Sequence, residues 1–126
     1  MSQYLKPADI TSNLVVGVDL NQYMDEADEA IVDLAEVLGV EKTDIVVPVH
    51  FQVRHYGVNY LMLRVCEDKM GTCSPDSLQF DKYFQLSDYY RKRVADIRNR
   101  ISVEMVLDQV NAQRDRSIMT GVLFRG

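Results

Sequence analysis

An apolar stripe with helical spacing runs through residues 20–38. Its members recur at steps of three and four residues, which places them on one face of an α-helix: Leu20, Tyr23, Met24, Ala27, Ile31, Leu34 and Leu38. Asp19 or Asn21 can cap the first turn, because a short polar side chain can accept a hydrogen bond from an unpaired backbone N–H group. Gly39 fits the left-handed position that ends many helices. The pattern predicts an amphipathic helix.

The next apolar segment predicts a helix at the centre of the fold. Pro48 is expected to open this helix, which runs to about Met70 and ends at Gly71. Its apolar residues form two stripes: Val49, Val53, Tyr56, Tyr60 and Leu63 on one side, and Phe51, Val58, Met62 and Val65 on the other. A helix that is apolar around most of its circumference is contacted on several sides. Gly57, in the middle, predicts the close approach of a neighbour.

Two further patterns predict helices at either end of the body. Lys6-Pro7-Ala8-Asp9-Ile10 predicts a short helix that stops before Gly17, because proline is favoured in a first helical turn. A long helix is expected from residue 77 or 78 to residue 100. Its inward-facing stripe would be Phe80, Tyr83, Ser87, Tyr90, Val94, Ile97 and Ile101.

The chain after this long helix changes character. Residues 102–108 predict one or two more helical turns, so the expected fold is all-α, a small helical bundle of about four helices over residues 1–110. Residues 111–126 are expected to form an extended C-terminal docking arm, because an apolar, β-prone stretch there follows a polar one and unpaired strand groups favour binding to another protein. The anchors would be Ile118, Met119, Val122, Leu123 and Phe124. The alternative is a terminus that frays or folds back on its own helices.

The sequence contains no motif for catalysis or metal binding. His50 and His55 stand five residues apart, so they do not share a helix face as an i, i+4 zinc pair does. Cys66 and Cys73 fit neither a disulfide framework nor a zinc-knuckle spacing, and we expect all four side chains to be structural. No glycine-rich phosphate loop or nucleophile elbow is present. We therefore expect no enzyme activity, no metal and no cofactor.

Composition and the N-terminal residues suggest a soluble protein. Apolar residues make up 47% of the chain and charged residues 26%, which is ordinary for a globular domain. No apolar run approaches the roughly 20 residues that span a bilayer. No basic segment followed by an apolar one opens the chain, so no signal peptide is expected. The cysteine usage favours a reducing compartment.

Charge is divided unevenly along the chain, whose net charge is −5. The first fifty residues carry ten acidic and two basic side chains, whereas the rest carry nine acidic and twelve basic ones. Such a split suits head-to-side packing of identical subunits, although it equally suits two solvated helix faces. For the packing interpretation, the expected contact joins an acidic set and a basic set: Asp25, Glu29, Asp33 and Glu36 of one subunit with Arg91, Arg93 or Arg98 of the next.

The basic side chains of the long helix also allow a nucleic-acid interpretation. They form one continuous face: Arg91, Lys92, Arg93, Arg98 and Arg100. Phosphate binding at such a face would depend strongly on salt. The chain as a whole is acidic, whereas dedicated nucleic-acid binders are usually basic. The acidic surface of a protein partner is therefore the favoured interpretation.

The order of these elements resembles a protein family. Tyr4-x-x-Pro7-x-Asp9-Ile10 is followed by a loop, an acidic amphipathic helix, a central helix opened by Val-Pro and a Tyr/Arg-rich helix. This order is similar to that of the head–tail connector adaptors of tailed bacteriophages, including the phage Mu-like head–tail joining proteins, which begin with a comparable Tyr-x-x-Pro-x-Asp-Leu segment. The resemblance covers roughly residues 3–107. The chain departs from the family in its tail and in Gly71-Thr-Cys-Ser-Pro75.

The resemblance implies a structural subunit without turnover. Such subunits form a ring, a dodecamer by resemblance, which docks under the portal, extends the DNA channel and joins head to tail. The implied partners are further copies of the chain, the portal protein and a tail-side connector or stopper, with channel DNA near only non-specifically and no membrane. The implied location is the virion neck, assembled in the host cytoplasm. The runner-up is a small helical regulatory module that binds nucleic acid, and a stopper protein is a weaker third reading because stoppers tend to be β-rich.

Overall fold

Helix α2 lies between the other elements of the fold. The computed structural model describes residues 4–10, 15 and 17–107. Within these residues the helices are α1 (Leu20–Val37), α2 (Phe51–Gly71), α3 (Leu78–Arg100) and α4 (Val103–Val106). They contain no strand, so the predicted all-α bundle is confirmed. The arm expected over residues 111–126 and the domain boundary at residue 110 lie outside the described residues.

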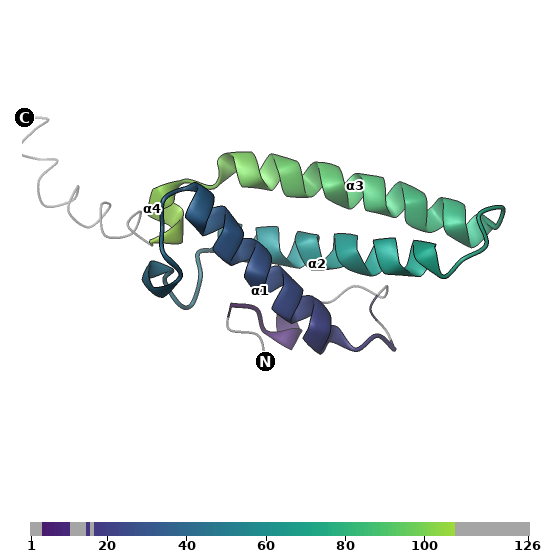
Figure 1. Cartoon of the computed structure of the whole chain (residues 1–126), viewed down its shortest axis with the longest axis horizontal. Helices are drawn as coiled ribbons and strands as arrows, with labels where there is room; N and C mark the ends of the chain where they lie inside the picture. The colour runs from purple at the N-terminus through teal and green to yellow at the C-terminus, as the bar shows by residue number, and fades with distance from the viewer. Residues whose placement is uncertain (1–3, 11–14, 16, 108–126) are drawn as a thin grey trace, which may run out of the picture.

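The arrangement of the helices follows from the two apolar sides of α2. Helices α2 and α3 form a long antiparallel hairpin, and α1 crosses α2 (Figure 1). Short α4 lies at the end of the hairpin where α3 finishes, and the N–H of Val46 in the loop before α2 donates to the carbonyl of Val106 at 3.1 Å. One core cluster gathers at this end, around Ile31, Val53 and Ile97. The other packs the N-terminal segment and the first half of α1 against the middle of α2.

The predicted limits of α1 are confirmed by its capping groups. The Asp19 carboxylate accepts a hydrogen bond from the N–H of Asn21 at 3.1 Å. Gly39 follows the helix with φ of +83°, a left-handed conformation that other L-residues adopt only with strain. Capping by local side chains explains why the helix could be bounded from sequence.

Helix α3 also agrees with its prediction. It begins after Ser77, whose hydroxyl accepts from the N–H of Phe80 at 3.0 Å. The expected inward-facing stripe is buried or half-buried at all of its positions. The other residues of α3 include exposed Leu78, Phe84 and Tyr89. The three- and four-residue spacing therefore identified the packed face correctly.

One predicted helix start and one predicted helix length are wrong. Pro48 does not open α2, which begins three residues later at Phe51 because the Nδ1 atom of His50 accepts a hydrogen bond from the N–H of Gln52 at 3.1 Å. Phe51 therefore stands at the helix start with 53% of its surface exposed, rather than in an apolar stripe. At the N-terminus, the predicted short helix is a single 3₁₀ turn at Pro7–Asp9. The chain turns extended at Ile10, which lets that side chain enter the second core cluster.

The close approach predicted at Gly57 is confirmed. A Cβ atom at this position would lie 3.0 Å from Cδ1 of Ile31 and 3.1 Å from Cδ2 of Leu5. The glycine therefore lets both α1 and the N-terminal segment reach the α2 backbone. This contact fixes which side of α2 is covered by α1.

Candidate functional site

The predicted acidic contact face lies on the outside of α1. Four carboxylates expected to meet a neighbouring subunit are exposed: Asp25, Glu29, Asp33 and Glu36. Two other acidic residues of α1 turn toward the body of the protein. Glu26 pairs with Arg64 on α2 at 3.4 Å, and Asp28 accepts from the N–H of Tyr4 at 3.4 Å. Because α1 contains no lysine or arginine, every charged group on its outer face is negative.

Most of the basic residues at the end of α3 are neutralised within their own helix. Lys92 and Arg91 contact the Asp88 carboxylate at 2.9 and 4.0 Å. Arg100 contacts Asp96 at 2.8 Å. These ion pairs are exposed and contribute little to stability. Each of them nevertheless places a carboxylate beside a basic side chain of α3. The continuous basic face expected from the sequence is thus a face of alternating sign.

Arg93 is held differently from its neighbours. Its Nε donates to Oδ1 of Asn59 on α2 at 3.2 Å, and its guanidinium lies 5.8 Å from the centre of the Tyr89 ring. The Asn59 amide is itself fixed, because its Nδ2 donates to the carbonyl of His55 one turn earlier at 2.8 Å. Asn59 is only 7% exposed. A buried side chain on one helix therefore positions an arginine on the other.

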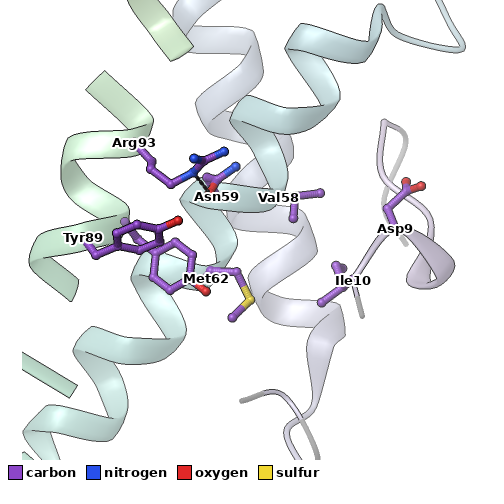
Figure 2. Close-up of a pocket in the computed structure, with 8 residues that line it drawn as sticks. Asp9, Ile10, Val58, Asn59, Met62, Tyr89 and Arg93 are labelled. Atoms are coloured by element: carbon purple, nitrogen blue, oxygen red, sulfur yellow. Dashed lines mark hydrogen bonds between the residues drawn. The ribbon is translucent and has the colours of Figure 1, made fainter. Parts of the chain in front are cut away.

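A pocket of about 310 Å³ opens beside this pair. Figure 2 shows Arg93 and Tyr89 on one side of it, Asp9 and Ile10 on the other, and Val58 and Met62 between them. The volume is at the small end of the range found for ligand sites. Burial raises the pKa of the Tyr90 hydroxyl, which also lines the pocket. The Asp9 carboxylate accepts from the N–H of Lys6 at 2.9 Å, so it is partly satisfied locally.

The remaining predicted contact residues are not brought together within the chain. Arg98 is exposed and makes no ion pair with a described residue. No ion pair joins α1 to α3 among the residues that the structure describes. The five anchors of the expected docking arm, Ile118, Met119, Val122, Leu123 and Phe124, lie outside the described residues.

The histidines and cysteines have the following environments. His50 caps α2, whereas His55 is exposed on its first turns. Cys66 is buried, which raises the pKa of its thiol, and Cys73 is half-buried; both are free. Within residues 4–10, 15 and 17–107, no three side chains of the metal-binding types are grouped so as to hold an ion. In the same residues, no helix is long and apolar enough to cross a membrane.

Sequence reasoning missed Asn59 and the pocket beside it. The sequence held one signal for Asn59, because it is a polar residue in a helix that is otherwise apolar on several sides. A polar group at a buried position needs a partner. Its partner is on α3, thirty-four residues later, and neither helix pattern indicates that the two side chains meet.

Comparison with known proteins gives no further guide to the site. The chain matches no protein-family model, no curated protein sequence and no solved structure.

Proposed function

We propose that this chain is a structural subunit of a phage neck ring, a head–tail adaptor that docks under the portal and joins head to tail. It would act without turnover, in contact with further copies of itself, with the portal protein and with a tail-side connector or stopper. The proposal starts from the resemblance of residues 3–107 to connector adaptors. The all-α body is compatible with it.

The observation that carries the proposal is the separation of two charged surfaces. The acidic face of α1 and the two α3 arginines that pair with no described carboxylate, Arg93 and Arg98, lie on different elements packed against α2, and no described ion pair joins the two helices. Two different, complementary surfaces on one subunit favour a heterologous contact, which closes into a ring when the rotation between subunits permits. A ring is the assembly that a neck adaptor needs.

The N-terminal motif supports the resemblance in a second way. Tyr4 and Ile10 of the Tyr-x-x-Pro-x-Asp-Ile segment are buried, each in a different core cluster. Asp9 accepts from the N–H of Lys6, which stabilises the turn between them. The residues of the motif therefore have roles in packing this segment against α2, as expected for a motif tied to a fold.

Nucleic-acid binding through Arg91, Lys92, Arg93, Arg98 and Arg100 is the second candidate, and the geometry supports it less well. Asp88 and Asp96 lie within ion-pair distance of Arg91, Lys92 and Arg100. A phosphate would have to compete with these carboxylates. The affinity for DNA should therefore be weak, and it should be the same for different DNA sequences.

Co-expression with the portal protein of the same phage tests the adaptor proposal. We expect a stable complex, with density for this chain beneath the portal ring by electron cryo-microscopy.

The sequence further predicts that deletion of residues 116–126 abolishes this attachment and leaves the helical content unchanged. The matched control replaces the five apolar anchors with serine in a chain of full length, which separates the effect of length from that of side chains. A chain that does not bind the portal at any concentration would refute the proposal.

A further inference from the structure

The guanidinium of Arg93 is oriented but not neutralised. Its Nε is engaged by Asn59, and its terminal nitrogens contact no carboxylate among the described residues. The other arginines and the lysine nearest to it on α3 contact carboxylates, with the exception of Arg98. An arginine fixed through Nε presents its two terminal nitrogens together, which is the geometry that binds a carboxylate with two hydrogen bonds.

Most of the residues around Arg93 favour a ligand with an acidic head and an apolar stem, and the one carboxylate among the described lining residues, Asp9, lies on the opposite side of the pocket and accepts from the N–H of Lys6 (Figure 2). Val58, Met62 and Ile10 form apolar walls, and the rings of Tyr89 and Tyr90 lie beside them. Apolar walls exclude water, and an ion pair that is partly shielded from water is stronger than one on an open surface. The methylene groups of a glutamate would pack on these walls while its carboxylate reaches the guanidinium. A pocket of about 310 Å³ can admit such a side chain.

We infer that this pocket receives an acidic side chain, Glu29 or its neighbour Asp33, from α1 of a second copy of the chain. Charge complementarity identifies the occupant. All charged groups on the outer face of α1 are negative, and neither Glu29 nor Asp33 forms an ion pair with a described residue. The inference rests on the proposal that the chain forms a ring, and it names the contact that holds neighbouring subunits together.

The two surfaces cannot meet within one chain. Helix α1 approaches α2 at Gly57, as the 3.0 Å distance from Ile31 shows. Asn59 follows two residues later, about 200° further around the helix, so it leaves α2 on nearly the opposite side. The pocket is on that side, between α3 and the N-terminal segment (Figure 2). Each subunit can therefore offer α1 to one neighbour and the pocket to another, and the contact can repeat around a ring.

Charge reversal at the pocket tests the inference. Sedimentation velocity at low salt should show that Arg93→Glu weakens self-association at least about tenfold, and that adding Glu29→Arg or Asp33→Arg to this variant restores part of the loss. The matched control is Lys82→Glu, which makes the same change of charge at an exposed position in the first half of α3, away from the pocket. Circular dichroism confirms that each variant is folded. Equal association of Arg93→Glu and the wild type, or a wild-type chain that stays monomeric, overturns the inference.

A cross-linking experiment identifies the contact even if charge reversal disturbs folding. A carbodiimide joins an amine directly to a carboxylate, so the conservative Arg93→Lys variant can report which acid lies at the pocket. Mixing isotopically labelled and unlabelled chains distinguishes cross-links between copies from those within one. We expect an intermolecular amide between position 93 and Glu29 or Asp33. An intermolecular cross-link from position 93 to another region only, or the absence of any, contradicts the inference.

The outcomes separate this inference from the adaptor proposal. If Arg93→Glu associates as the wild type does while the chain still binds the portal, the pocket contact is wrong and the adaptor proposal stands. If association depends on Arg93 but the chain binds no portal, the contact is correct and the neck location is wrong.

Discussion

The hydroxyl of Tyr23 on α1 donates a hydrogen bond of 2.6 Å to Oδ2 of Asp68 on α2. The other oxygen of the same carboxylate lies 3.6 Å from Nη2 of Arg64, and Arg64 also contacts Glu26 on α1. This polar group joins the two helices outside the apolar core. It therefore fixes the position of α1, and with it the direction of the acidic face, by contacts that a purely apolar interface would not specify.

Removing the Tyr23 hydroxyl should lower stability. Hydrogen bonds to charged groups stabilise proteins more than neutral ones do, but this one is near the surface, so Tyr23→Phe should lower the free energy of unfolding by about 1 kcal/mol. The matched control is Tyr4→Phe. The Tyr4 hydroxyl is buried without a hydrogen-bond partner among the described residues, so its removal should leave stability unchanged or raise it. Urea denaturation at neutral pH measures both values, and an equal loss in the two variants would contradict the assignment.

The same hydrogen bond predicts how stability depends on alkaline pH. The hydrogen bond to the Asp68 carboxylate and, to a smaller extent, burial of the tyrosine hydroxyl raise the pKa of Tyr23 to about 12. An unfolded tyrosine has a pKa of about 10. Because the folded pKa is the higher one, the stabilisation is fully present below about pH 10 and is lost as pH rises through about 12.

The difference between the wild type and Tyr23→Phe isolates this contribution from the other tyrosines. The difference in free energy of unfolding should be constant from neutral pH to about pH 10 and should shrink above it. Urea denaturation at a series of pH values checks the trend. A difference that is the same at pH 7 and at the highest pH where the protein still folds would refute it.

The parts of the fold that were predictable from sequence are those decided by neighbours in sequence. The spacing of apolar residues defines the inner face of α3, and Asp19 and Gly39 mark the ends of α1 because caps act within one turn. The start of α2 was missed because the sequence offers both Pro48 and His50 near this point. Proline in a first helical turn is the more common pattern, but the side chain that caps the helix is that of His50.

The polar contacts between helices were not predictable for a different reason. Asn59 with Arg93 and Tyr23 with Asp68 are separated by thirty-four and forty-five residues. Whether such side chains meet depends on the register of one helix against another, which is set by packing of the whole core. The sequence indicated only that Arg93 belongs to a basic face. The pocket that sets Arg93 apart from the other basic residues of α3 depends on the register of α3 against α2.

The close contact at Gly57 leaves no room for a large side chain. Its nearest neighbours are the ends of the Leu5 and Ile31 side chains, and a leucine would have to displace both. Overpacking of this kind usually costs about 1–3 kcal/mol, so Gly57→Leu should lower the thermal midpoint. The control is Gly71→Ala, at the end of α2, where a Cβ meets nothing within 4 Å. That change should stabilise by a few tenths of a kcal/mol to about 1 kcal/mol. A tolerated leucine would show that α1 is not packed closely on α2.

The cap at the start of α2 predicts the effect of changing His50. Its ring nitrogen satisfies the N–H of Gln52, and loss of a side-chain cap typically costs about 1 kcal/mol. His50→Ala should therefore lower the free energy of unfolding by about that amount, and His50→Ser, which keeps an acceptor, should recover much of it. His55→Ala is the control, because that exposed side chain does not cap the helix. Equal stability of His50→Ala and His50→Ser in chemical denaturation would contradict the capping role.

Asn59 allows stability and assembly to be separated. Asn59→Leu keeps a similar shape at a buried position and removes the acceptor that positions Arg93. Arg93 is exposed and can be hydrated instead, so the free energy of unfolding should change by less than about 1 kcal/mol or rise. Self-association should nevertheless weaken several-fold, because the guanidinium must be ordered before it can bind a carboxylate. Thermal unfolding and sedimentation velocity on the same samples make the comparison. A large loss of stability with unchanged association would mean that Asn59 serves the core alone and that Arg93 does not depend on it for its position.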